Sequence, residues 1–290
     1  MTDQILALMH GMGHTLLQLG VWLAIAMAVM IPLEHWRALR PQAVLRPRFL
    51  QDILYFFVSG VVPAFFLLVV YAVVVRFFQA LLPRGWFVWV QSLPGGVRLV
   101  ATLLAADFGF YWAHRWAHEW PAIWRFHAIH HSPTQIDWLV ATRTHPFEIV
   151  WLRGLSFVPL FALGLIDPFA PGQSTGIMLV VIFNVMWGFF IHGNVSIRLR
   201  WLEKIVATPR FHHWHHANDG ESTHGKNYAA LLPFLDRLFG TAHLPGHDYP
   251  DQYGCTTKVP DHFLAQLALR PALRPAVAAA GAEEATLLQR

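Results

Sequence analysis

The sequence predicts an all-α integral membrane protein, a bundle of about four or five spanning helices with a cytoplasmic, histidine-rich helical cap. Hydrophobic residues make up 55% of the 290 positions and aromatic residues 14%, and only 13% are charged. Charged residues are about a quarter of an ordinary soluble chain, so this composition excludes a soluble enzyme of ordinary type and a disordered chain. The 18 histidines also outnumber the 17 Asp and Glu residues, which points to a cluster of imidazoles.

Five apolar segments approach the length of about 20 helical residues that crosses a bilayer. They are Leu16–Leu33, Ile53–Val75, Val97–Ala113, Phe157–Ile166 and Ile177–Ile191. No basic residue precedes the first segment, so we expect an uncleaved anchor and not a secretory signal. The last two segments are short and could form a hairpin that does not fully cross, so the number of full spans stays open.

The basic residues indicate the orientation of these segments. With five spans, the connecting stretches alternate between the two sides of the membrane. Of the 21 Lys and Arg residues, 18 lie in the stretches 34–51, 114–153 and 194–290 on one side, and two lie on the other side, in 76–96. Cytoplasmic loops carry the excess of basic residues, so we expect the long stretches in the cytoplasm. The net charge is +4, but the basic residues are dispersed among apolar runs, which argues against a nucleic-acid partner.

Three regions are expected along the chain: N-terminal transmembrane helices in 1–96, a histidine-rich domain with further spans in 97–241, and a C-terminal tail in 242–290. The end of this tail, Ala265–Arg290, is rich in alanine, and we expect it to be loosely attached and without chemistry. Cys255 is the single cysteine, so an intrachain disulfide, a thiolate zinc site and a CxxC pair are excluded. Any metal must then be held by nitrogen and oxygen ligands.

Eight histidines follow helical spacing beside the predicted spans. They are His114 and His118, then His127, His130 and His131, then His212, His215 and His216. Residues three or four apart share one helix face, so each set presents its imidazoles together. One metal ion takes about four protein ligands, and eight imidazoles therefore suggest two metals. His192, which ends the last apolar segment, is expected to be a ninth ligand.

The remaining histidines are less decisive. His145 and His224 lie near the patterned sets, and the sequence leaves open whether they are ligands. His213 lies off the face shared by its neighbours and is expected beside the site or in solvent. The isolated histidines, expected at the surface or the membrane boundary, are His10, His14, His35, His243, His247 and His262.

Neighbouring residues support a helix around His114. Tryptophans at positions 112, 116, 120 and 124 recur every fourth residue, on the face opposite the imidazoles, and are expected to pack or to lie at the membrane boundary. Asp107 and Tyr111 precede His114 on its own face. A carboxylate inside a span needs a partner, and we expect Asp107 to accept the second ring N–H of a histidine ligand. Pro121 should end this helix and open the next.

Ligand type alone leaves Fe, Zn, Cu and Ni open. The zinc hydrolase pattern HExxH is missing because position 122, three residues after Glu119, is not histidine, and zinc deaminases need two cysteines. Soluble di-iron bundles need several Glu-x-x-His motifs, and the chain has only the pair Glu221 and His224. Bis-histidine haem would need pairs inside the spans. The best fit is a membrane non-haem di-iron centre built almost wholly from imidazoles.

Several motifs carry a family resemblance. HRWAH (114–118), FHAIHHS (126–132), RTHPFE (143–148), HGN (192–194) and TPRFHHWHH (208–216) resemble the fatty acid hydroxylase/sterol desaturase superfamily, and NYAALLPFLDRLFGT (227–241) resembles the end of its domain. The similarity runs from about Leu99 to Thr241. HRWAHE is also similar to alkylglycerol monooxygenases, in which a Glu, here Glu119, follows the second histidine. The chain departs from the family pattern at His213 and at His224–Gly225.

The resemblance implies a bacterial-type membrane oxidase with two non-haem Fe ions and O2 as co-substrate. It would hydroxylate or desaturate a lipid from the bilayer, with electrons from a separate ferredoxin- or cytochrome b5-like donor or a reductase. The eight patterned histidines and His192 would be ligands, with Asp107 and Glu119 supporting them. The location would be the bacterial inner membrane, with the site facing the cytoplasm.

Two alternatives remain from the residues. One is a zinc-dependent membrane hydrolase, which would work without O2. The other is a non-enzymatic metal-binding membrane protein, a transporter or a sensor. Transport would need ionisable residues along several spans, and apart from Asp107 the predicted spans are nearly free of them.

Overall fold

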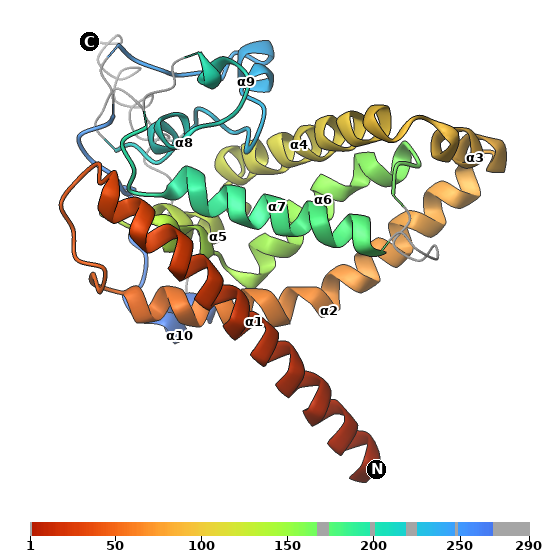
Figure 1. The fold of residues 1–290 in the computed structure, drawn as a ribbon, viewed down its shortest axis with the longest axis horizontal. Helices are drawn as coiled ribbons and strands as arrows, with labels where there is room; N and C mark the ends of the chain where they lie inside the picture. Colours follow the sequence, from red (N-terminus) through yellow and green to blue (C-terminus); the bar gives the residue numbers. More distant parts are fainter. Residues whose placement is uncertain (1, 167–173, 198–200, 219–224, 247–248, 269–290) are drawn as a thin grey trace, which may run out of the picture.

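The computed structural model describes residues 2–166, 174–197, 201–218, 225–246 and 249–268 (Figure 1). Their regular secondary structure is helical, which confirms the predicted all-α class. The helices are α1 (Thr2–Trp36), α2 (Phe49–Leu81), α3 (Arg84–Ser92), α4 (Gly95–Glu119), α5 (Pro121–His131), η1 (Trp138–Thr142), α6 (Pro146–Ala162), α7 (Ser174–His192), η2 (Leu202–Lys204), α8 (Pro209–His215), α9 (Phe234–Leu238) and α10 (Phe263–Leu267). Two isolated β-bridges, Ala38 with Val195 and Ala217 with Tyr253, tie loops together.

Two helices of the described chain are long and apolar enough to cross a membrane. They are α1, over His10–Trp36, and α2, over Phe49–Leu81. α3 and α4 together form a third candidate, but their axes meet at a bend of 115°. The described helices thus offer two or three spans, against the four or five expected from the sequence.

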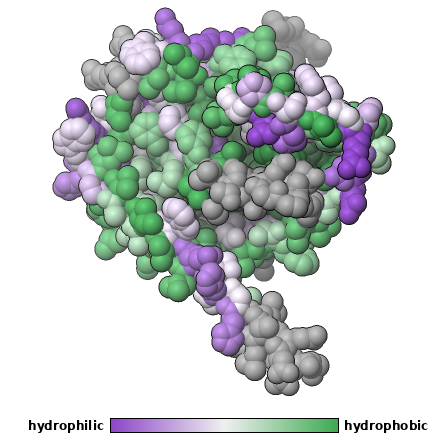
Figure 2. Space-filling view, turned by 45° about the vertical axis from the view of Figure 1, so that its right-hand side comes forward, coloured by the Kyte–Doolittle hydropathy of each residue, from purple (hydrophilic) through white to green (hydrophobic). Residues whose placement is uncertain are grey.

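Much of the molecular surface is apolar. On α2, Phe65 is 70% exposed and Val73 is 64% exposed, and on α1 Leu17 is 67% exposed. Figure 2 shows hydrophobic side chains over much of the visible face. Apolar patches of this extent are rare on monomeric soluble proteins, so this surface fits contact with lipid.

Helix α6 lies between α2 and α4 and packs closely on α4. Position 109 has no room for a side chain, since a Cβ there would lie 2.7 Å from the carbonyl oxygen of Leu155 and 2.9 Å from that of Ser156. The Ser156 hydroxyl donates to the Ala106 carbonyl oxygen at 2.8 Å. Gly109 therefore lets the two helix backbones approach, which sets the position of α4, the helix that carries His114.

A buried ion network joins the start of α2 to the segment that leads into α6. Asp52 is fully buried and accepts hydrogen bonds from Arg46 at 2.8 Å and from Arg143 at 2.9 Å. Arg46 also pairs with Asp137, whose carboxylate accepts the backbone N–H groups of Leu139 and Val140 at the start of η1. Charges buried in this way are stable only when paired and hydrogen-bonded. The network thereby fixes the chain just before α6.

Replacement of Gly109 with Ala is expected to destabilise the protein, because the added methyl group would collide with the α6 backbone. Overpacking of this kind costs about 1–3 kcal/mol, so the melting temperature of the detergent-solubilised protein should fall. Gly188→Ala is the control, because a Cβ at Gly188 in α7 meets no atom within 4 Å. Equal melting temperatures for the two variants would contradict the close approach of α4 and α6.

Candidate metal centre

All nine histidines expected to be ligands come together in two buried groups. The first group is His114, His118, His127, His131 and His215, and the second group is His130, His192, His212 and His216. Within each group, one ring nitrogen from every member lies within 4.8 Å of the others. The helical spacing in the sequence thus corresponds to real convergence in space.

Four helices supply these side chains. α4 presents His114 and His118 one turn apart, and Pro121 at the first position of α5 turns the chain so that α5 faces back toward them. Pro121 therefore ends one helix and opens the next as predicted. α5 supplies His127, His130 and His131. α7 supplies His192 at its last residue, and α8, whose N-terminus is capped by the Thr208 side chain, supplies His212 and His215, with His216 directly after it.

In the first group the Nε2 atoms face one another. The Nε2 of His127 lies 3.1 Å from that of His114, 2.9 Å from that of His118 and 3.1 Å from that of His131. The His215 ring lies against the same set, with its centroid 4.4 Å from that of His114.

The second group has the same construction. The Nε2 of His192 lies 2.9 Å from that of His212 and 3.2 Å from those of His130 and His216. The two groups adjoin, since the rings of His131 and His216 stack with centroids 4.3 Å apart. Two metal positions side by side are therefore available.

The outer ring nitrogens establish which tautomer the inner ones have. The Nδ1 of His114 donates to the Tyr228 carbonyl oxygen at 2.7 Å, that of His215 to the Lys226 carbonyl oxygen at 2.8 Å and that of His192 to the Gly188 carbonyl oxygen at 2.7 Å. A carbonyl oxygen only accepts, so these Nδ1 atoms carry the proton. Their Nε2 atoms then point a lone pair into the centre.

His127 follows the same rule through a carboxylate. Its Nδ1 donates to Glu148 Oε1, and both side chains are buried. A carboxylate on the outer nitrogen of a histidine orients the ring and raises its basicity as a ligand. Burial raises the pKa of Glu148 well above its usual value, so this arrangement needs a nearby cation that keeps the carboxyl ionised. With Glu148 ionised, the Nε2 lone pairs of His114 and His127 meet at 3.1 Å with no proton between them.

A metal ion fits this donor set. Facing lone pairs repel unless a cation lies between them, and among the described residues the buried Nε2 of His215 has no hydrogen-bond partner. Bonds from zinc to imidazole nitrogen are about 2.1 Å long, so two nitrogens on one ion lie about 3.0–3.4 Å apart for bond angles between a right angle and the tetrahedral angle. The 2.9–3.2 Å separations agree with that spacing.

The protonation of the histidines in the two groups points the same way. Burial lowers the pKa of these rings well below the usual value, and repulsion from neighbouring imidazoles lowers it further; the rings are His130, His131, His212, His215 and His216. Burial disfavours the charged form because the low-dielectric interior solvates it poorly. The rings are therefore neutral at pH 7, which is the form that binds metals.

Asp107 and Glu119 do not make the contacts expected of them. Asp107 accepts the backbone N–H groups of Ala230, Leu231 and Leu232, so its partner is a loop and not a histidine ring. This loop follows Tyr228, whose carbonyl holds His114, and Asp107 thus supports the site from further away. Glu119 lies at the surface, its side chain 43% exposed, and pairs with Arg115 on the preceding turn of α4.

Glu148 is the site residue that sequence reasoning missed. It lies within the motif RTHPFE, in the first turn of α6, and is fully buried. A carboxylate at the start of an apolar helix could have indicated a buried site residue. Its partner could not be identified, because Glu148 lies 21 residues from His127 in the sequence. Only the packing of α6 beside α5 brings them together.

Two histidines that lie near the patterned sets in the sequence stay outside both groups. His145 caps the N-terminus of α6, where its Nδ1 accepts the backbone N–H of Phe147 at 3.1 Å. His213 is buried and bonds through Nδ1 to the Tyr253 hydroxyl at 2.7 Å. His224 lies outside the described residues.

The tryptophans divide into two kinds. Trp116 and Trp120 stack with ring centroids 5.3 Å apart, and Trp120 is 46% exposed, as expected for a membrane-boundary residue. Trp124 is buried and packs, as expected, but it faces the imidazoles and not away from them, with its ring centroid 5.2 Å from that of His118. The break at Pro121 rotates α5 relative to α4 and so turns Trp124 toward the imidazoles.

Part of the expected C-terminal tail packs on the site. Trp124 donates to the Thr257 hydroxyl at 2.9 Å, and the Tyr253 hydroxyl contacts His213. Gln266, inside the segment expected to be loosely attached, is buried and accepts from the Tyr55 hydroxyl at 2.8 Å. Residues 249–268 thus cover α5 and α8, whereas 269–290 lie outside the described residues.

The chain is similar in sequence to known proteins. Residues 99–241 match the fatty acid hydroxylase family. This is the range, Leu99 to Thr241, that the sequence motifs indicated. This segment belongs to the fatty acid hydroxylase family. No solved structure matches the chain.

Three curated relatives illustrate the range of the similarity. Ornithine lipid hydroxylase OlsE of Rhizobium tropici is 36% identical over 184 residues, which are 62% of this chain and 52% of that protein. Human alkylglycerol monooxygenase is 36% identical over 141 residues, 49% of this chain and 29% of that protein. The rice very-long-chain aldehyde decarbonylase GL1-7 is 24% identical over 145 residues, 47% of this chain and 21% of that protein. The chain therefore spans about half the length of the first relative and less than a third of the others.

Glu148→Gln is expected to weaken metal binding, because a neutral amide is a poorer acceptor for the Nδ1–H of His127. Loss of such a partner lowers metal affinity about 10–100-fold. The weaker binding is tested by titrating the protein with a chelator and measuring the retained metal by elemental mass spectrometry. Glu119→Gln is the matched control and should retain metal like the unaltered protein. Equal retention by all three proteins would contradict the role of Glu148.

Proposed function

We propose that this protein is a membrane-bound, O2-dependent di-iron oxidase that hydroxylates a lipid at an unactivated C–H bond. The observation that carries the proposal is the pair of adjoining groups, nine buried histidines in all, within a segment of the fatty acid hydroxylase family. Two relatives are named a lipid hydroxylase and a monooxygenase, which favours hydroxylation over desaturation. The substrate is a fatty acyl, sterol or ether lipid.

The two groups would each hold one iron. His114, His118, His127, His131 and His215 would hold the first, and His130, His192, His212 and His216 the second. Iron bound there would supply O2 activation and the two-electron oxidation of the C–H bond. Two further electrons would come from a separate ferredoxin- or cytochrome b5-like donor or a reductase, because O2 needs four in total.

The chain itself prepares the site for this chemistry. The carbonyl oxygens of Tyr228, Lys226 and Gly188 hold the protons of three outer ring nitrogens, so the inner lone pairs stay available. Glu148 does the same for His127. Burial of all nine rings excludes bulk water, which protects reactive species from side reactions.

The membrane arrangement completes the proposal. Four or five spans would carry the histidine groups as a cytoplasmic cap at the inner membrane, where the lipid enters laterally and the electron donor arrives from the cytoplasm. Residues 1–96 would form the N-terminal membrane helices and 97–241 the oxidase domain. Of the tail in 242–290, residues 249–268 would belong to the cap, because they pack on α5 and α8.

Removal of a single histidine from either group should abolish the activity. His127→Ala and His212→Ala are each expected to lower bound iron from two ions per chain and to eliminate product, because each group loses a converging nitrogen. His145→Asn is the control, since asparagine preserves the N-cap of α6 and this residue lies outside both groups. Iron content and lipid product are measured together. Full activity of either alanine variant would contradict the assignment.

Oxygen dependence separates the proposal from its alternatives. Cells that contain the protein are expected to incorporate one atom of 18O from labelled O2 into a lipid. Mass spectrometry of lipids from cells with and without the protein measures this incorporation. Product formed without O2 would indicate the zinc hydrolase instead. Bound metal with no lipid change would indicate a non-enzymatic metal-binding protein.

A further inference from the structure

Helix α3 lies at the end of α4 opposite the histidines. Gly95, the first residue of α4, precedes His114 by 19 residues, and a helix of that length separates them by about 28 Å. α3 meets α4 at 115°, so it runs nearly across the axis of α4. Its surroundings therefore belong to a different part of the molecule from the metal centre.

The last turn of α6 fixes the orientation of α3. The Trp86 indole donates to the Leu163 carbonyl oxygen at 3.2 Å, and the Gln91 amide donates to the Gly164 carbonyl oxygen at 2.9 Å. Gly164 has a left-handed φ of 68°, and a Cβ there would lie 2.8 Å from the Phe87 ring. α3 is thus held against the bundle, although much of its surface faces outward.

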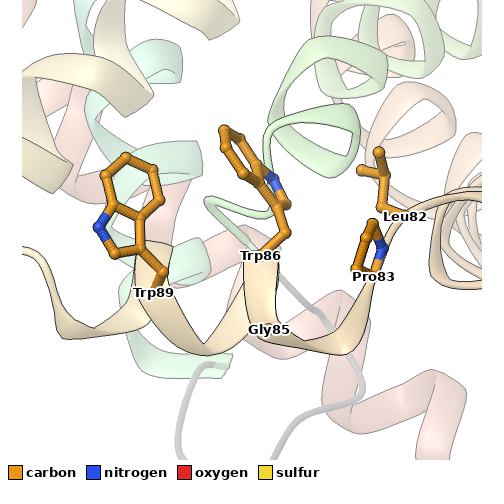
Figure 3. Close-up of a pocket in the computed structure, with 5 residues that line it drawn as sticks. All are labelled: Leu82, Pro83, Gly85, Trp86 and Trp89. Atoms are coloured by element: carbon orange, nitrogen blue, oxygen red, sulfur yellow. The ribbon is translucent and has the colours of Figure 1, made fainter.

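That outward surface is apolar and rich in tryptophan. Val88 is 64% exposed and Trp89 is 53% exposed. Trp86 and Trp89 stand on the same side of α3 beside an open apolar pocket of about 530 Å³ (Figure 3). The pocket is lined by Leu82, Pro83, Gly85, Trp86 and Trp89.

A second aromatic cluster lies at the other end of α4. Trp116 stacks on Trp120, and the Trp120 ring lies 5.7 Å from that of Trp151. From Gly95 to Trp116 the helix rises by about 32 Å over 21 residues. The hydrocarbon core of a bilayer is about 30 Å thick, and tryptophan is enriched at both of its boundaries. The two clusters therefore match the two faces of one membrane.

We propose that α3 lies in the plane of the leaflet opposite the histidine groups, and that its pocket takes an acyl chain of a phospholipid of that leaflet. The pocket walls suit an acyl chain because they are apolar. Arg84, at the start of α3, and Arg76, near the end of α2, are exposed beside this end of the molecule, where guanidinium groups can bind lipid phosphates. This membrane contact stands apart from the oxidase activity.

The depth of α3 in the membrane tests the first part of the proposal. Cys255→Ala removes the single cysteine, and a fluorescent thiol label is then placed at Trp89→Cys in lipid nanodiscs. Lipids brominated near the headgroup should quench it more than lipids brominated near the chain end. Leu104→Cys, an exposed position within α4, should show the reverse, and Asp251→Cys should be quenched by aqueous iodide alone.

Three outcomes at position 89 would overturn this placement. Quenching by iodide alone would put α3 in water. Stronger quenching by lipids brominated near the chain end would make α3 a re-entrant helix. Protection from both quenchers would mean that protein, such as a second copy of this chain, covers the surface.

Filling the pocket tests the lipid site. Gly85→Phe adds a ring inside it, and Gly96→Phe adds the same ring outside it; a Cβ meets no atom within 4 Å at either position. Phospholipid retained by the purified protein, measured by native mass spectrometry, should fall several-fold for Gly85→Phe and stay unchanged for Gly96→Phe. Equal retention by the two variants would overturn the assignment of the pocket.

Discussion

The histidine centre depends on one electrostatic constraint, the repulsion between buried ring nitrogens whose lone pairs face one another. The Tyr228 carbonyl oxygen holds the proton of His114 on its outer nitrogen, and an ionised Glu148 does the same for His127. The inner nitrogens of these two rings then meet at 3.1 Å without a proton between them. A cation between the rings turns this repulsion into four or five favourable bonds. Metal binding and the packing of α4, α5, α7 and α8 are therefore coupled, because the helices supply the same nitrogens that repel without metal.

The neutrality of the ligands has an electrostatic consequence. Nine neutral imidazoles would compensate none of the charge of metal ions bound there, and an uncompensated charge in a low-dielectric interior is costly. Glu148 is the carboxylate that contacts the set, through the outer nitrogen of His127. Burial raises the pKa of Glu148, and a bound metal ion would favour its ionised form, whose negative charge would offset part of the cost without occupying a metal position. Carboxylate-rich di-iron bundles solve the same problem with carboxylates bound directly to the metals.

The architecture places different demands on the two ends of α4. At one end the helix must deliver His114 and His118 into a buried polar centre, and Gly109 permits the close contact with α6 that positions them. At the other end the chain bends sharply into α3 and exposes tryptophans to the surroundings. One helix thus connects a site that excludes water to a surface suited to a membrane boundary.

The sequence by itself determined the helical class, the family and the nine clustered histidines, because helical periodicity and local motifs depend on neighbours a few residues apart. Pro121 as the junction of two helices was predictable for the same reason. The tertiary structure alone decided how the histidines divide into two groups, since His215 joins the first and His192 the second across long sequence distances. It also assigned the carboxylate role to Glu148 and made Asp107 a partner of a backbone loop. These pairings depend on which helices pack against one another. Helix packing joins residues that are far apart in the sequence, so no local sequence pattern predicts it.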